Sequence, residues 1–288
     1  MPAIVGEDVD FRAPLKLLAG IHYAVLAGKA SWDEVPRALE EHAEFLREFV
    51  RRTNVQTNEV QRSWMLLPCF LEIARRTGAQ TFDLIELGPS AGFNLLWDEY
   101  RYRYTEGVWG LDDAVLELAG KERRPVPAEL LRRRPRVRSR IGIDTEPIDV
   151  TQRYGVLALK AFVWPDQRWR LELLDRAVEA VRRNRPPIVE GDLVEKLPRL
   201  LAERRRDALT VVYQTAVLSY LPPERRELVY QALEAAGRDG ALAYVGTHSP
   251  LDESDHYYGL GIQVWPGSGE REIVAQADFH GAWLEWLA

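Results

Sequence analysis

The sequence predicts an α/β fold in which a doubly wound, mostly parallel Rossmann-like sheet follows an N-terminal helical subdomain. From Thr81 onward, short apolar runs alternate in most cases with helix-length amphipathic segments, a pattern typical of a parallel sheet with helices on both faces. Before about Gly78, apolar residues recur at helical spacing and no strand pattern is present. We therefore place a helical subdomain at residues 1–78 and the sheet domain at 79–288.

The helical subdomain is predicted to contain three helices. The first is FRAPLKLLAGIHYAVLAG, and the second begins at SWDEVPRALEEHAEFLREFVRR, where Ser31 and Glu34 have capping-box spacing. The third, NEVQRSWMLLPCFLEIARRTG, is interrupted by Pro68 and ended by Gly78.

The sheet domain is predicted to contain five buried strands and a terminal antiparallel hairpin. The strands are TFDLIEL, SRIGID, PPIVEGD, ALTVVYQ and GALAYVG, and DQRWRLELLDRAVEAVRRN and PERRELVYQALEAAG are helices among them. The tail, YGLGIQVW followed by PGSG and EREIVAQAD, has the pattern of two strands around a tight turn.

One segment, at about residues 98–135, does not fit this alternation and is predicted to be an insertion. In EYRYRYTEG, Tyr100, Tyr102 and Tyr104 fall on one side of an extended strand. The segment is either a half-buried strand that packs its tyrosines or part of a lid over a substrate.

Composition favours a soluble globular protein without export or membrane signals. The 288 residues are 46% hydrophobic, their net charge is −6, and Cys69 is the only cysteine, which excludes an internal disulfide. No apolar run reaches the roughly 18 residues of a membrane span, and the acidic start is unlike a signal peptide. We expect a cytoplasmic protein, with nucleic acid an unlikely main partner. The basic stretch Arg132–Arg140 is either a solvated loop or an RNA contact.

The stretch LIELGPSAGFNLLWDEY ends a strand on an acid, turns tightly through Glu86, Gly88, Ser90 and Gly92, and is then predicted to be helical. The Gly-x-Ser-x-Gly spacing departs from the dinucleotide fingerprint, and a carboxylate at Glu86 would repel pyrophosphate but suit a cationic amine or sulfonium. The loop therefore predicts a nucleoside-containing cofactor, S-adenosylmethionine. Two alternatives are a structural turn and a nucleophile elbow, with Ser90 as the nucleophile of an α/β hydrolase.

Two further acids end the next predicted strands, and polar residues end the fourth. Ligands of doubly wound sheets lie outside the carboxyl ends of the strands. There Asp144 could accept hydrogen bonds from ribose hydroxyls, and Asp192 could accept one from an adenine amino group while Leu193 contacts the ring. Either aspartate could instead be a helix cap or a loop residue. Gln214 and Thr215 leave the sheet at the corresponding height.

Several blocks of the chain resemble a bacterial family of unknown function that is placed with the class I S-adenosylmethionine-dependent methyltransferase-like folds. The resemblance covers nearly the whole chain and includes DLIELGPSAGFNLLWDEYRYRY, RIGIDTEPIDV, EGDLVEKLP and VVYQTAVLSYLPPERR. The methyltransferase layout implies roles for the residues at the strand ends: the methionine part near Glu86, Gly88, Ser90 and Gly92; the ribose at Asp144; the adenine at Asp192 and Leu193; the sulfonium near Gln214 and Thr215. The chain departs from this layout at Ser90, which replaces the usual middle glycine, and at Gln214, where the family often has histidine.

Methyl transfer needs alignment of donor and acceptor, and it needs a general base only for a weakly acidic acceptor. His248 and His280 are the candidate bases, and each could instead be a structural histidine. No group has convincing metal-ligand spacing; His248, Asp252, Asp255 and His256 come nearest and are expected to form a solvated loop. The predicted partner is a small-molecule acceptor, and a non-catalytic nucleoside-binding regulatory protein is the alternative.

Overall fold

The computed structural model describes residues 12–55, 58–248 and 257–288. The chain divides into two compact units, which we call the helical unit (residues up to Asn58, with Ile148–Val178) and the sheet unit (Glu59–Pro147, with Glu179–Ala288). This division differs from the border predicted at residue 78. The helix that precedes the sheet belongs to the sheet unit, because its Phe70 ring packs edge-on against Tyr213 of a central strand, 5.1 Å between centroids.

The helical unit has a small apolar core of its own. Leu17, Ile21, Leu46 and Val50 pack together in it. The predicted helix from Ser31 is split at His42, and Ser31 Oγ accepts the Asp33 backbone N–H at 3.2 Å. Its elements are α2 (Ala13–Leu26), η1 (Trp32–Glu34), α3 (Val35–Glu41), α4 (Ala43–Arg52), α6 (Arg153–Ala161) and the first part of α7 (Arg168–Arg183). None of the helices in the described ranges is both long and apolar enough for a membrane span.

The sheet unit is built on a nine-stranded sheet with the order β5-β12-β11-β10-β9-β8-β1-β6-β7. The block β7-β6-β1-β8-β9 is parallel, and its order is that of the doubly wound fold. The predicted hairpin is confirmed as β10 and β11, and β12 extends it. The strands are β1 (Thr81–Leu87), β5 (Lys121–Arg124), β6 (Arg136–Asp144), β7 (Ile188–Glu190), β8 (Leu209–Gln214), β9 (Leu242–His248), β10 (Tyr258–Trp265), β11 (Glu272–Ala277) and β12 (Trp283–Trp286).

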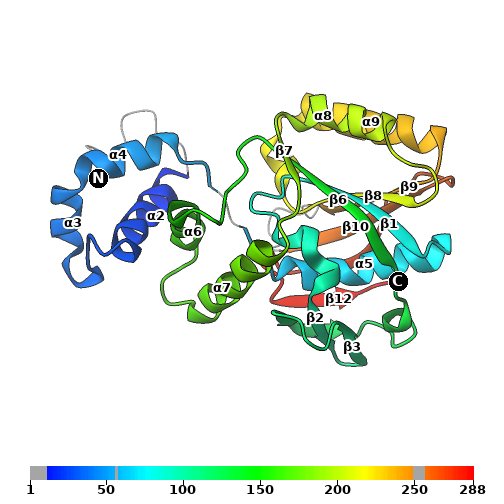
Figure 1. Cartoon of the computed structure of the whole chain (residues 1–288), viewed down its shortest axis with the longest axis horizontal. Coiled ribbons are helices and arrows are strands. Elements are labelled where there is room, and N and C mark those ends of the chain that lie inside the picture. The colour runs from blue at the N-terminus through cyan, green and yellow to red at the C-terminus, as the bar shows by residue number, and fades with distance from the viewer. Residues whose placement is uncertain (1–11, 56–57, 249–256) are drawn as a thin grey trace. The chain divides into compact units, whose positions relative to one another are not determined.

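Helices cover both faces of this sheet, as the alternating pattern predicts (Figure 1). On one face, α8 (Leu193–Ala202) and α9 (Pro223–Asp239) bury leucines against β1, β6, β8 and β9. On the other face lies α5 (Arg62–Thr77), which has Pro68 inside it and ends at Gly78, in a left-handed conformation with φ of 70°. A sheet covered on both faces explains why the central strands are apolar along their whole length.

The turn after β1 leads into a short 3-10 segment, η2 (Phe93–Glu99), where the sequence predicts a helix. Its backbone is kinked at Leu96, and Phe93, Leu95 and Trp97 are all buried. Because the chain must enter another strand at Arg101, little room remains for an α-helix.

The inserted segment forms a second, three-stranded sheet of β2 (Arg101–Tyr104), β3 (Gly107–Gly110) and β4 (Glu117–Ala119). Tyr100, Tyr102 and Tyr104 are buried, and their hydroxyls donate to backbone carbonyls of Phe93, Trp97 and Trp64. The prediction that the tyrosines share the buried side is therefore confirmed, and their hydroxyls are used within the protein.

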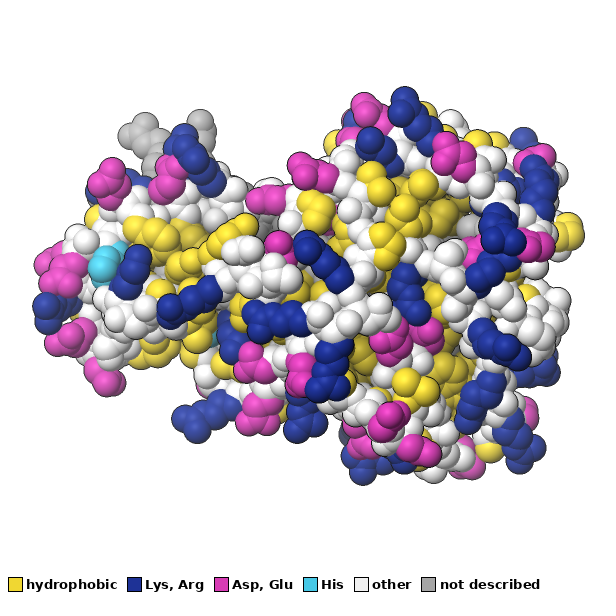
Figure 2. All heavy atoms as spheres, in the orientation of Figure 1, with side chains coloured by type: hydrophobic (Ala, Val, Ile, Leu, Met, Phe, Trp, Pro, Cys, Tyr) yellow, Lys and Arg dark blue, Asp and Glu magenta, His cyan; other side chains and the backbone are white. Residues whose placement is uncertain are grey.

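The basic stretch Arg132–Arg140 runs into β6 instead of forming a loop throughout. Arg138 pairs with Asp83 and Asp207, and Arg140 pairs with Asp98. On the face visible in Figure 2, Lys and Arg side chains are interspersed with Asp and Glu. Arg138 and Arg140 thus serve the sheet unit's own ion pairs.

Gly237 of α9 lies where the helix contacts the indole of Trp265, and we predict that Gly237→Ala destabilises the protein. A Cβ at Gly237 would lie 2.4 Å from Trp265 Cγ. The gain in helix propensity is about 1 kcal/mol, whereas overpacking a rigid ring costs about 1–3 kcal/mol. Thermal unfolding should show a net loss, and in a double-mutant cycle with Trp265→Leu the loss should shrink. An equal loss in both backgrounds would contradict this explanation.

Candidate functional site

β1 lies between β6 and β8, and both of these strands run parallel to it. Within the parallel block, the chain after β1 first forms β6 and β7 on one side and then β8 and β9 on the other. The carboxyl end of β1 is thus the point where a doubly wound sheet opens a crevice. Glu86 lies opposite Gly142 and Tyr213 in register, and Asp144 ends β6. Two of the predicted acids therefore lie at the ends of adjacent strands.

Glu86 is buried, with 2% of its surface exposed. The Tyr213 hydroxyl lies 3.2 Å from its Oε2 and 3.1 Å from the Asn94 carbonyl oxygen. Burial raises the pKa of Glu86 to about 8; the negative charge of Asp144 adds to the rise, and hydrogen bonds from Tyr213 and Asn94 oppose it. The carboxyl is therefore mostly protonated at neutral pH, and a cation placed beside it would favour its ionised form.

The loop after β1 owes its glycines to close packing within the protein. Gly88 and Gly92 have φ of 69° and 83°, and an added Cβ would come within 2.5 Å of Val217 and 2.7 Å of Pro186, respectively. Between them Ser90 adopts a φ of 52°, which is uncommon for a residue with a side chain. The four predicted loop residues are thus brought together at the tip of β1, and the glycine positions are explained without a ligand.

Asp144 joins this loop to the tip of β6. Its Oδ2 accepts the Ser90 backbone N–H at 2.7 Å, and its Oδ1 accepts the Glu146 backbone N–H at 2.9 Å. A carboxylate offers about four acceptor positions, so two backbone donors leave capacity for further hydroxyl donors. The side chain is partly exposed.

Asp192 and Leu193 have structural contacts of a different kind. Asp192 is the N-cap of α8: its Oδ1 accepts the Val194 backbone N–H at 2.8 Å, and its Oδ2 pairs with Arg225 of α9. Leu193 is 6% exposed and belongs to the core beneath α8 and α9. The structure thus gives both residues a packing role, and their role toward adenine stays a prediction.

Gln214 ends β8 with its amide enclosed. Its Nε2 donates to the Tyr244 hydroxyl at 3.2 Å and to the Thr247 carbonyl at 3.1 Å, while its buried Oε1 has no hydrogen-bond partner among the described residues. A buried acceptor without a partner is uncommon in folded proteins, and the role of Gln214 toward a cofactor stays a prediction. Thr215, which follows, is half-buried.

The two candidate bases lie at different places. His248 ends β9 and faces a cavity, and burial together with the charge of Arg271 lowers its pKa to about 4. His280 lies between β11 and β12, and its backbone N–H donates to Asp278 Oδ1 at 2.9 Å. Asp252, Asp255 and His256 lie outside the described residues. Within the described ranges, no three His, Cys, Asp or Glu side chains are grouped to hold a metal ion.

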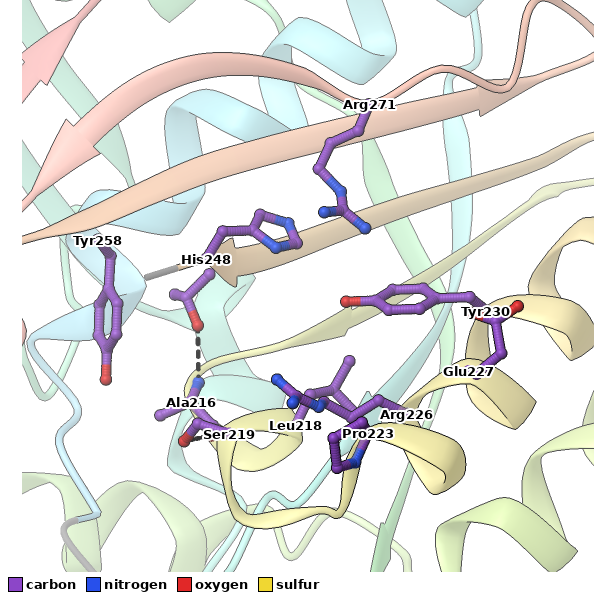
Figure 3. A pocket seen from close by; sticks show the side chains of 11 residues that line it. Ala216, Leu218, Ser219, Pro223, Arg226, Glu227, Tyr230, His248, Tyr258 and Arg271 are labelled. Carbon is purple, nitrogen blue, oxygen red and sulfur yellow. Dashed lines mark hydrogen bonds between the residues drawn. The ribbon is translucent and has the colours of Figure 1, made fainter. Parts of the chain in front are cut away.

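The cavity that His248 faces includes functional candidates that sequence reasoning missed. They are Arg226 and Tyr230 of α9, Tyr258 at the start of β10, and Arg271 just before β11 (Figure 3). Arg226 and Tyr230 are four residues apart and so share a helix face, which is a signal the sequence contains. Because arginine is abundant in this chain, this spacing alone does not distinguish Arg226 from the other arginines.

We predict that Glu86→Gln changes how stability depends on pH. The folded pKa of Glu86, about 8, is above its ordinary value of 4.5, so between these values the unfolded chain binds fewer protons. The wild-type protein should therefore lose stability from Glu86 as pH rises through this window. Glutamine cannot ionise, so the stability of the variant relative to wild type should rise by on the order of 1 kcal/mol per pH unit. Calorimetric melting between pH 5 and 8 measures this.

Glu72→Gln is the matched control with the opposite sign. Burial raises the pKa of Glu72, but hydrogen bonds and charges from Arg75 and Arg76 outweigh burial and lower it overall. Ionised Glu72 therefore stabilises the folded protein above pH 4.5, its ordinary pKa, and this contribution is lost as pH falls below that value. The prediction would be contradicted if the difference in stability between Glu86→Gln and wild type stayed constant from pH 5 to 8.

Comparisons with known proteins give a family and distant structural likenesses. An S-adenosylmethionine-dependent methyltransferase from Clostridium acetobutylicum ATCC 824 is 9% identical, with 83% of this chain and 77% of that chain covered and a TM-score of 0.27. That score is too low to support an argument about this chain. No curated protein matches the sequence. A family model matches residues 7–286, nearly the whole length, and the chain therefore belongs to the family described as "Uncharacterized protein conserved in bacteria (DUF2332)".

Proposed function

We propose that this protein is an S-adenosylmethionine-dependent methyltransferase that acts on a small-molecule acceptor in the cytoplasm. The observation that supports this most is the arrangement at the switch point: Asp144 accepts the Ser90 backbone N–H at 2.7 Å, and its charge influences the pKa of the buried Glu86. An acid able to bind hydroxyls and an acid able to balance a positive charge thus lie at the ends of adjacent strands. This combination suits a cationic nucleoside better than a pyrophosphate.

Each part of the cofactor would be bound by different residues. Asp144 would accept from the ribose hydroxyls, and Glu86 would balance the positive charge of the methionine part from beneath the loop of Gly88, Ser90 and Gly92. The orphaned Oε1 of Gln214 would accept a donor at the floor of the site. Asp192 and Leu193 are proposed for the adenine end, where Asp192 would have to act from its place as the N-cap of α8.

When bound, S-adenosylmethionine supplies a methyl group on a sulfonium sulfur, which an acceptor displaces in line to leave S-adenosylhomocysteine. The chain's contribution is to align the acceptor, exclude water and, for a weakly acidic acceptor, take up its proton. His248 would take up that proton as a neutral imidazole, and its lowered pKa, about 4, makes it a weak base. His280 is the second candidate, from the loop after β11.

Asp144→Ala should weaken binding of S-adenosylhomocysteine by about 1–3 kcal/mol, the scale of hydrogen bonds to a charged group. Isothermal titration calorimetry measures the loss. Asp149→Ala is the matched control, because Asp149 Oδ1 also accepts a backbone N–H two residues ahead, from Thr151 at 2.9 Å, but lies outside the sheet. The proposal fails if wild-type protein does not bind S-adenosylhomocysteine, or if both variants lose the same affinity.

Two alternative functions predict different experimental results for the same protein. A non-catalytic nucleoside-binding protein would bind S-adenosylhomocysteine but turn over no acceptor. A hydrolase is worth testing because the positive φ of Ser90 is the kind of strain found at nucleophile elbows. We expect a fluorophosphonate probe to leave Ser90 unlabelled, as judged by mass spectrometry of the intact protein. Stoichiometric labelling that Ser90→Ala abolishes would instead establish a serine nucleophile.

A further inference from the structure

The cavity at the carboxyl ends of β8 and β9 has a volume of about 420 Å³, within the range of small-molecule sites. One wall consists of Ala216, Leu218 and Pro223 from the segment after β8 and the start of α9. The opposite wall comes from the end of β9, the start of β10 and Arg271, which precedes β11. Figure 3 shows His248 and Arg271 on one side of the recess and Arg226, Leu218 and Pro223 on the other.

Two arginines enter this cavity without forming ion pairs among the described residues. The Arg226 Nε is buried and has no hydrogen-bond partner. The Arg271 guanidinium lies 5.0 Å from the ring centroid of Tyr230, so its aromatic contact leaves its N–H donors available. By contrast, Arg138 of the same unit pairs with Asp83 and Asp207.

The remaining polar groups of the cavity add donors. His248 Nε2 is buried without a hydrogen-bond partner, and its lowered pKa makes the ring neutral, with one N–H to donate. Gly261 of β10 leaves the room for this arrangement, since a Cβ there would lie 2.9 Å from His248 Nε2 and 3.0 Å from Arg271 Cγ. Glu227 is the one carboxylate among the lining residues, and it accepts from Gln231 at 3.2 Å. Two arginines and one glutamate leave a net charge of +1.

We propose that this cavity binds the anionic group, a carboxylate or a phosphate, of a small-molecule ligand between Arg226 and Arg271, with its apolar part against Leu218 and Pro223. The buried Arg226 Nε lacks a partner, whereas Arg271 is exposed; an oxyanion between them would accept charge-assisted hydrogen bonds from both guanidinium groups. His248 Nε2 would donate to or accept from the same ligand.

The cavity adjoins the predicted cofactor residues through the end of β8. Gln214 Nε2 donates to the Thr247 carbonyl, and the Ala216 backbone N–H donates to Thr247 Oγ1 at 2.7 Å. Identification of the ligand as the methyl acceptor rests on the proposed function. The anion site itself does not, since it depends only on the cavity's own side chains.

The test is calorimetric titration of the full chain, without S-adenosylhomocysteine and at fixed ionic strength, with inorganic phosphate, benzoate and uncharged benzamide. We expect saturable binding of at least one anion, about tenfold tighter than benzamide, and a loss of about tenfold or more in Arg226→Gln and in Arg271→Gln. Preference for benzoate or for phosphate identifies the anionic group. Arg238→Gln is the matched control on α9, because Arg238 is exposed and pairs with Glu234.

Three results would overturn the anion site: no saturable binding of either anion, benzamide binding as tightly as benzoate, or an equal loss in Arg238→Gln. Melting temperatures of the variants verify folding, and each arginine variant tests the site separately. Because cofactor is absent from these titrations, their failure is distinct from a failure of S-adenosylhomocysteine to bind in the Asp144 experiment.

Discussion

Strand β1 is paired on both edges by parallel strands, and the features of the sheet unit follow from this constraint. Parallel pairing sets the carboxyl ends of β6, β1 and β8 at one edge of the sheet, so the polar residues that end those strands lie together. The same pairing places Glu86 on the face that α5 covers, with Tyr213 of β8 beside it. A carboxyl held there loses its water, and the rise of its pKa is the consequence.

The sequence was most informative where burial alone decides the structure. β1 begins and ends where its apolar run does, and β10 and β11 form the hairpin that the tail pattern predicts. The segment after Gly92 was harder, because Phe93, Leu95 and Trp97 have an apolar pattern compatible with a helix, and only the demand to enter β2 at Arg101 ends it early. The division into two units could not be predicted from the order of the segments either, because Ile148–Val178, from the middle of the chain, belongs to the same unit as the first helices.

Individual site residues show the same limit. The closeness of Glu86, Ser90 and Asp144 follows from strand order, which periodicity can predict. Strand order does not show whether Asp192 binds a ligand or caps its own helix, because an aspartate before a helix suits both roles. The pairing of Asp192 with Arg225 depends on how α8 and α9 pack. Arg271 meets Tyr230 across 41 positions of sequence (271 − 230), which no local pattern reveals.

The two candidate sites contain ionisable groups of opposite kinds, carboxyl groups in one and guanidinium groups in the other. Glu86 and Asp144, at the ends of β1 and β6, form an acidic region suited to a cationic donor, whereas Arg226 and Arg271 line a cavity suited to an anionic acceptor. Gln214 and Ala216 bond to Thr247 between them and so fix the end of β8 against the end of β9. A cation and an anion held on either side of this junction attract each other, and the attraction strengthens as water is excluded. Under the proposed function, this separation of charge along one sheet edge would help to align donor and acceptor, and uptake of a proton from the acceptor would remain the task of His248.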